Sequence, residues 1–331
     1  MVRLIVNRLV GAAGVLLVLV TIVFVLRALI PSDPARAAVG PNASPAVVAQ
    51  ERHRLGLDHP VPVQYVLYLG NALRLNLGES ARTSRPVQID LAAFVPATVE
   101  LALFAMILAV AGGLLLGVLA ATASRGAGVV RFSLVAGAAA PSFLLALILI
   151  YVFYFKLSWL PGSGQTSLSD APSGPTGLLV VDGLLAGRSG VVGDALTHLA
   201  LPGLTLAFVP SVAIGRVLRS SLLAVYRTDY IRTAEAKGLH PRAILFHHAL
   251  RNALSAPLSM TGLQVGLMLG GVVIVETIFS WPGIGLYTDQ SIQFGDLTAI
   301  TGVTLVVGAA YVLVNLLVDV AQAVADPRIR F

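Results

Sequence analysis

The chain has 331 residues, of which 56% are hydrophobic and only 11% are charged. A soluble domain of this length carries about a quarter charged residues, so the composition excludes an ordinary soluble protein and indicates a membrane protein. The chain contains no cysteine, which excludes disulfide frameworks and thiolate chemistry. Its net charge is +6, and the distribution of that charge is more informative than its size.

Several apolar segments are long enough to cross a hydrocarbon core of ~30 Å at ~1.5 Å per residue. We predict six membrane spans, at residues 9–30, 97–121, 133–156, 197–219, 253–277 and 298–324. The fold class is therefore an all-α polytopic membrane protein. The first span could instead be a signal peptide, because Ala35-Arg36-Ala37 resembles a cleavage site. Its apolar stretch is long enough to span, which favours a retained helix.

The distribution of basic residues predicts the orientation. With the amino terminus inside, 13 Lys and Arg residues and 4 acidic residues fall on the cytoplasmic side, against 9 and 12 on the outer side. Cytoplasmic loops carry an excess of Lys and Arg, and the short loop 122–132 and both tails are basic. An even number of spans then places both termini in the cytoplasm.

Two long segments on the outer side carry different signals. Ser44-Pro45 predicts a helix start, with a helix to Leu55 that ends at Gly56, and a second helix is expected over 64–78. These helices predict a small cap on the outer membrane face. Residues 161–193, rich in Gly, Pro, Ser and Asp, predict a flexible outer loop.

We accordingly divide the chain into two regions. Residues 1–96 contain the first span and the outer helical cap, and residues 97–331 form a five-helix core with a cytoplasmic loop at 226–252.

The loop between the fourth and fifth spans is polar and basic. Gly238 permits a left-handed helix end, and His240 precedes Pro241, which disfavours helix at His240 and restarts it at Pro241. The pattern predicts a short helix, a sharp corner and a second helix that continues into the fifth span. A lateral push on the short helix would then tilt that span. The alternative is an amphipathic loop lying on the membrane surface.

The chain lacks the motifs of the common catalytic sites. Its two lysines, Lys156 and Lys237, do not follow glycine, so a phosphate-binding GxxxxGK[ST] loop is excluded. HExxH and GxSxG motifs are absent, and the six histidines have no convincing metal-ligand spacing. We expect no catalytic residue, metal or cofactor on this chain. Any energy for transport, if the chain takes part in it, must come from a partner protein or an ion gradient.

Several segments together resemble one known family. RTAEAKG (232–238), followed by HALRNAL (248–254), resembles the EAA-type loop of ABC importer permeases in the dipeptide, oligopeptide and nickel branch. PATVELAL (96–103), WLPGSG (159–164) and VETIFSWPGIG (275–285) agree in order with that branch. The chain is identified as a member of its B-type permease subunits, and the resemblance covers nearly the whole length.

The resemblance implies the type I ABC importer permease fold in the cytoplasmic (inner) membrane. It also implies partners: a homologous permease, two ATPase subunits that use ATP and Mg, an extracytoplasmic substrate-binding protein and the lipid bilayer, without nucleic acid. The implied function is import of short peptides by alternating access. Nickel chelates, glutathione and haem-like cargo are the alternatives within the branch.

Two rival classes make different demands on the sequence. A gradient-driven secondary transporter needs a carboxylate or histidine relay at mid-membrane. A membrane-embedded enzyme needs a clustered acid–base or metal set within its spans. Neither set is evident in the sequence.

Carried onto this chain, the resemblance implies an ATPase-coupling loop that consists of Tyr230, Arg232, Thr233, Ala234, Ala236, Lys237, Gly238 and Arg251. Tyr226, Tyr230, Thr233, Ala234 and Lys237 are predicted to share one helical face, on which Ala234 would allow close approach of another surface. Arg232 stands where the wider superfamily often has glutamate. Pro257 lies one residue later than the family pattern leads us to expect.

Other candidates lie in or near the spans. Gly262, Gly266 and Gly270 form a small-residue face of the fifth span, and Gly113 and Gly117 form one on the second. Polar groups at depth usually face protein or water, so Gln264, Gly266, Gly270 and Glu276 are the candidate passage or gate. For the glycine faces the alternative is plain helix packing, and for Glu276 it is an outer-gate or packing role. The turn with Trp281, Pro282 and Gly283 is expected to anchor at the outer interface, near the docking surface for the binding protein.

Overall fold

The computed structural model describes residues 2–29, 34–40, 42–122, 128, 134, 137, 141–170 and 174–325. The regular elements of these residues are helices, and Glu79 and Pro86 form an isolated antiparallel bridge. The chain divides into two compact units, residues 1–98 with 282–317 and residues 99–281 with 318–331. Residues 282–317 thus group with the amino-terminal region.

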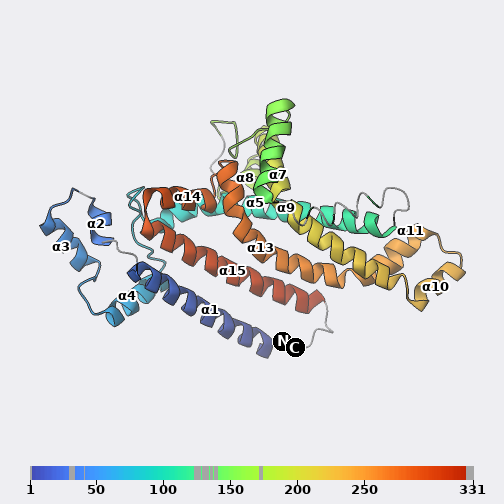
Figure 1. Ribbon diagram of the computed structural model, residues 1–331, viewed down its shortest axis with the longest axis horizontal. Coiled ribbons are helices and arrows are strands. Elements are labelled where there is room, and N and C mark those ends of the chain that lie inside the picture. Colours follow the sequence, from blue (N-terminus) through green and yellow to red (C-terminus); the bar gives the residue numbers. More distant parts are fainter. Residues whose placement is uncertain are drawn as a thin grey trace. The chain divides into compact units, whose positions relative to one another are not determined.

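Five described helices have the length and apolar composition to cross a membrane (Figure 1). They are α1 (Val2–Leu29), α5 (Val87–Thr122), α9 (Ser189–Val225), α13 (Ser255–Ile278) and α15 (Leu297–Ala325). The helical membrane class is confirmed. Part of the expected third span, 133–156, lies outside the described residues. The helices described within it are α7 (Ser142–Leu149) and the π-helix η2 (Ile150–Lys156).

Three helices begin well before their predicted starts. α1 starts at Val2 instead of residue 9, α5 starts at Val87 instead of residue 97, with Pro96 inside it, and α9 starts at Ser189 instead of residue 197. The prediction followed the apolar stretch, which marks the part that fits in hydrocarbon. Backbone hydrogen bonding continues past that limit, so the helices are longer than the apolar stretches.

The segment that is predicted to form the outer cap is helical. It contains α2 (Pro34–Val39), α3 (Pro45–Arg54) and α4 (Val61–Leu73). The Ser44 side chain accepts a hydrogen bond from the Val47 amide at 3.5 Å and so caps α3. α4 lies against α1, where the hydroxyls of Tyr65 and Thr21 are 2.8 Å apart and the Tyr65 ring meets Phe24 edge-on.

The first unit is held together around α14 (Ile284–Phe294), a helix that the sequence analysis missed. Tyr287 on α14 is fully buried, and its hydroxyl donates to Asp90 at 3.1 Å. Asp296 accepts from the Ser80 hydroxyl at 2.6 Å and from the Arg82 amide at 3.1 Å. Burial, and then the charge of Asp90, raise the pKa of Tyr287 to about 12. The phenol therefore stays a neutral donor within this network.

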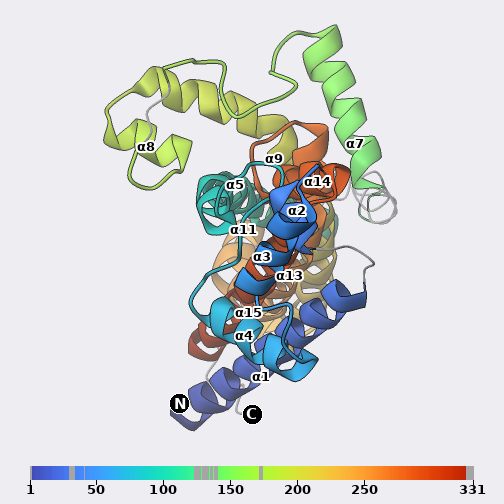
Figure 2. The same ribbon diagram turned by 90° about the vertical axis from the view of Figure 1, so that its left-hand side faces the viewer.

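The second unit is organised around α9, which packs against α13, α7 and α8 (Leu179–Leu185). Figure 2 shows α8 beside the first turns of α9. The segment 161–193, predicted as a flexible loop, is therefore partly helical. Glu100 also anchors it, because its carboxylate accepts from Gln165 Nε2 and from the Val180 amide, each at 2.7 Å.

The glycines of α5 face α9 at close range. A Cβ atom at Gly113 would lie 2.7 Å from Ile214, and one at Gly117 would lie 2.8 Å from Leu218 Cβ. Such distances are below van der Waals contact, so only glycine permits this approach of the two helices. The small-residue face of α5 is therefore a packing face inside the chain.

We predict that Gly117→Ala destabilises the protein while Gly193→Ala does not. Both changes add the same methyl group to a glycine within a long helix, but a Cβ at Gly193 meets nothing within 4 Å. Overpacking at Gly117 should cost about 1–3 kcal/mol, whereas alanine at Gly193 should be neutral or stabilising. Thermal unfolding in mild detergent checks this, and equal melting temperatures of the two variants would contradict the α5–α9 contact.

Candidate functional site

The candidate coupling segment begins where α9 ends. α9 stops at Val225, and a turn over 226–228 leads into α10 (Asp229–Ala236). Tyr226 caps α9, with its amide donating to the Leu222 carbonyl at 2.9 Å. The prediction that Tyr226 shares a helical face with Tyr230 is therefore wrong, because Tyr226 lies in the turn that precedes the helix of Tyr230.

The corner after α10 has the predicted geometry. Gly238 adopts a φ of 74°, in the left-handed region. Its amide donates to the Glu235 carbonyl at 2.9 Å, and the Leu239 amide donates to the Ala234 carbonyl at 3.2 Å, which together form a Schellman motif. His240 is extended, and the next helix, α11 (Pro241–Ala243), starts with proline. The helix–glycine–proline–helix prediction is confirmed.

The second arm of the segment is interrupted. After α11 come the π-helix η3 (Ile244–Ala249) and α12 (Leu250–Ala253), and a bend at Leu254 precedes α13. The prediction of one helix running into the fifth span is wrong. Pro257 in the first turn of α13 cannot donate to the Ala253 carbonyl, and its ring crowds that group. Movement of α10 would therefore reach α13 through a bend.

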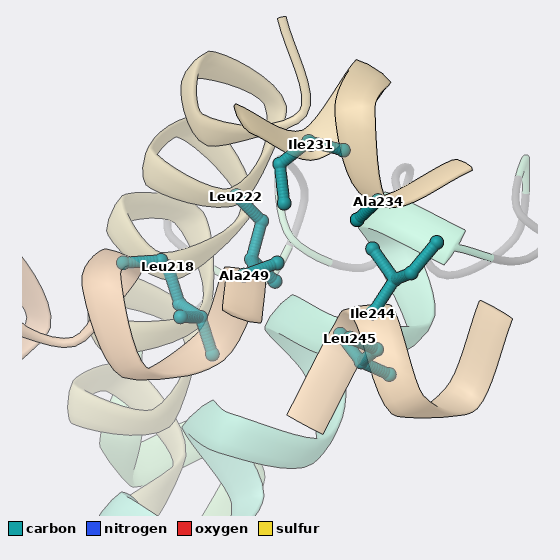
Figure 3. Close-up of a cluster of buried hydrophobic side chains, with 8 residues drawn as sticks. Leu218, Leu222, Ile231, Ala234, Ile244, Leu245 and Ala249 are labelled. Carbon is teal, nitrogen blue, oxygen red and sulfur yellow. The ribbon is translucent and has the colours of Figure 1, made fainter. Parts of the chain in front are cut away.

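An apolar core joins α10 to the rest of the second unit (Figure 3). We call it the α10 cluster; its members are Leu218, Leu222, Ile231, Ala234, Ile244, Leu245, Ala249 and Ala253. Ile231 is fully buried and Ala234 is 6% exposed. Figure 3 shows both beside side chains of α9 and η3. Ala234 thus allows close packing within the chain, which corrects the expectation that it faces another surface.

The solvent-exposed face of the segment carries the other predicted coupling residues. Tyr230, Arg232, Thr233, Ala236, Lys237, Gly238 and Arg251 are all exposed. Arg232 Nη1 lies 3.3 Å from the Asp229 carboxylate in a solvent-exposed pair, which contributes little to stability. Two large apolar side chains, Tyr230 and Leu239, are also open to solvent, at 43% and 40%. This face is available to a partner.

The predicted passage residues do not share one environment. Gln264 and Gly266 are buried on α13, but Gly270 is exposed, and a Cβ there would meet nothing within 4 Å. Glu276 is fully buried. Its side chain is therefore closed to a substrate in this structure, and its role in a passage stays a prediction.

The turn after α13 is not an exposed aromatic anchor. Trp281 is fully buried, and its amide donates to the Glu276 carbonyl at 2.8 Å. Gly283 is buried too, and Pro282 is partly exposed. The expectation of an interfacial Trp281 is wrong, because its ring is part of the chain's own core. Docking of a binding protein at this turn stays a prediction.

Five long apolar helices and a polar segment anchored in the core define a class among the described residues, that of a polytopic helical membrane protein. Residues 113–331 match the family of binding-protein-dependent transport system inner membrane components, and residues 1–102 match the amino-terminal region of such membrane components. The chain belongs to this family of ABC importer permeases.

Named relatives cover nearly the whole chain. The dipeptide transport system permease protein of Alkalihalophilus pseudofirmus is 39% identical over 98% of both chains. The di/tripeptide transport system permease protein of Pseudomonas aeruginosa is 44% identical over 93% of this chain and 92% of its own. A probable D,D-dipeptide transport system permease protein of Escherichia coli has the same identity and coverage.

We predict that Ala234→Asp loosens the coupling segment, while Ala236→Asp leaves it folded. The two positions lie on the same helix, but Ala234 is buried in the α10 cluster and Ala236 is exposed. A carboxylate forced into an apolar core loses hydration without a partner. Limited proteolysis in detergent should cleave the Ala234→Asp variant between residues 226 and 253. Equal resistance of both variants would refute the burial of Ala234.

Proposed function

We propose that this chain is the membrane-spanning permease subunit of an ATP-driven importer of short peptides. The observation that carries the proposal is that α10 is anchored in the core on one face and exposed to solvent on the other, in a chain that belongs to the importer permease family. The three relatives described above are named as transporters of dipeptides, tripeptides or D,D-dipeptides. These names favour peptides over nickel chelates, glutathione or haem-like cargo.

In the proposed arrangement six helices span the cytoplasmic membrane and both termini lie in the cytoplasm. The chain pairs with a homologous permease, two ATPase subunits and an extracytoplasmic binding protein. ATP and Mg are used by the ATPase subunits, which receive α10 on the cytoplasmic side. The chain itself has no phosphate-binding loop, so it contributes no step of ATP hydrolysis.

The described contacts suggest how movement passes through the chain. A force on α10 acts on the α10 cluster, which includes side chains of α9 and η3. α13 packs along α9, so it is moved both by that contact and through the bend at Leu254. Alternating access then follows from tilt of α9 and α13. Gln264, Gly266, Gly270 and Glu276 remain the proposed lining or gate of the passage.

The functional test uses Gly238→Val with Gly187→Val as its matched control. Both glycines have positive φ, 74° and 66°, and both have open space around a Cβ. Valine should cost about 1–2 kcal/mol of local backbone strain at either position. Only Gly238 forms the corner of the proposed coupling site.

In proteoliposomes with all partner subunits, we expect Gly238→Val to abolish ATP-dependent dipeptide uptake. The variant should also abolish the stimulation of ATP hydrolysis by the dipeptide and its binding protein. Gly187→Val should retain both activities. Uptake by Gly238→Val at the level of Gly187→Val would contradict a coupling role for the corner. Absence of peptide uptake by the unaltered complex would contradict the proposed function.

The orientation is tested by single cysteines, since the natural chain has none. Ala236 and Ser189 are both exposed, and the proposed topology places them on opposite sides of the membrane. An impermeant maleimide added to intact cells should label Ser189→Cys, and should label Ala236→Cys only after the inner face is opened. The reverse pattern would invert the topology.

A further inference from the structure

A pocket lies beside the corner of the coupling segment. Its lining residues are Tyr226, Glu235, Leu239, Pro241 and Ile244, and it contains about 420 Å³ of empty space, part of it open solvent. The walls come from the end of α9, from α10 and from the start of the second arm. One side is apolar, and the polar groups are a phenol and a carboxylate.

The carboxylate of the pocket belongs to Glu235, and it is an acidic group in a mainly basic segment. Residues 216–252 contain seven Lys and Arg residues and two acids, Asp229 and Glu235. Asp229 pairs with Arg232. The Glu235 carboxylate has no hydrogen bond or ion pair with any residue that the structure describes. The pocket therefore carries an unpaired acidic group within a segment that is otherwise mainly basic.

Tyr226 supports this description of the pocket. Burial and, after it, the charge of Glu235 raise the pKa of the Tyr226 phenol. The hydroxyl therefore stays protonated at cytoplasmic pH, and its oxygen can accept a hydrogen bond from a cation. Leu239, Pro241 and Ile244 offer apolar surface of the kind that the methylene stem of a long basic side chain covers.

We propose that this pocket receives a single lysine or arginine side chain of the ATPase subunit, with its charge on the Glu235 carboxylate and its stem on Leu239 and Pro241. The inference rests on the proposed function, because it names the chemistry by which the partner holds the same segment. Because charges are complementary across an interface, we expect the partner to present acidic groups around that cation, opposite the basic residues of this segment. A single cation surrounded by acidic groups would fix how the two proteins align when they dock.

The test measures the affinity of the ATPase subunits for the detergent-solubilised permease pair without nucleotide. The variants are Glu235→Gln, which removes the charge, and Glu235→Lys, which reverses it. Asp229→Asn is the matched control, since Asp229 is an exposed acid of the same helix outside the pocket. Folding of each variant is verified by its elution in size-exclusion chromatography.

We expect Glu235→Gln to weaken ATPase binding at least about tenfold, because a charge partner would be left desolvated at the interface. Glu235→Lys should weaken it further, whereas Asp229→Asn should stay within about threefold of the natural chain, since exposed pairs contribute little. Zero-length carbodiimide coupling should join Glu235 to the ATPase when the inserted residue is lysine.

Three results would overturn the inference. The first is equal binding by Glu235→Gln and Asp229→Asn. The second is tighter binding by Glu235→Lys, which would show that the partner presents an acid. The third is coupling of Glu235 to Lys237 or to the companion permease, which would assign the pocket to another occupant. If the ATPase subunits fail to bind the natural chain at all, the proposed function itself fails, and this outcome is distinguishable from the other three.

Discussion

The burial of Ile231 and Ala234 against α9 and η3 is the interaction on which the proposed mechanism depends. α10 has only eight residues, which is too short for a stable isolated helix in water. Its apolar side chains pack against Leu222, Ile244 and Leu245, so tertiary contacts hold it as a helix. In the proposed mechanism a displacement of α10 would reach α9 and η3 through this cluster, because close-packed side chains transmit strain.

α9 connects the other parts of the second unit. At Gly113 and Gly117 it lies against α5 without room for a side chain, and towards its end it contributes Leu218 and Leu222 to the α10 cluster. Leu218 takes part in both contacts. A tilt of α9 would therefore act on α5 and α13 together, which suits a helix that transmits movement from the coupling segment.

Three buried carboxylates hold parts of the fold together. Asp90 accepts a hydrogen bond from the Tyr287 hydroxyl on α14, Asp296 accepts one from the Ser80 hydroxyl, and Glu100 accepts one from the Val180 amide in the first turn of α8. Buried polar groups of this kind are normally hydrogen-bonded, as these three carboxylates are. Glu235 differs from these three, because it is exposed, its carboxylate is unpaired among the described residues, and it lines a pocket. That difference is consistent with a role in recognition.

The sequence by itself determined the helical membrane class and the corner at Gly238 and Pro241. These features depend on local sequence: long apolar runs, a glycine that tolerates positive φ and a proline that starts a new helix. They can therefore be predicted without knowledge of the fold. Only the tertiary structure decided which way Ala234 and Trp281 face, that α14 forms, and that Pro257 interrupts the second arm. A small or aromatic side chain is equally compatible with a core and with an interface, and the choice between them depends on neighbours that are distant in the sequence.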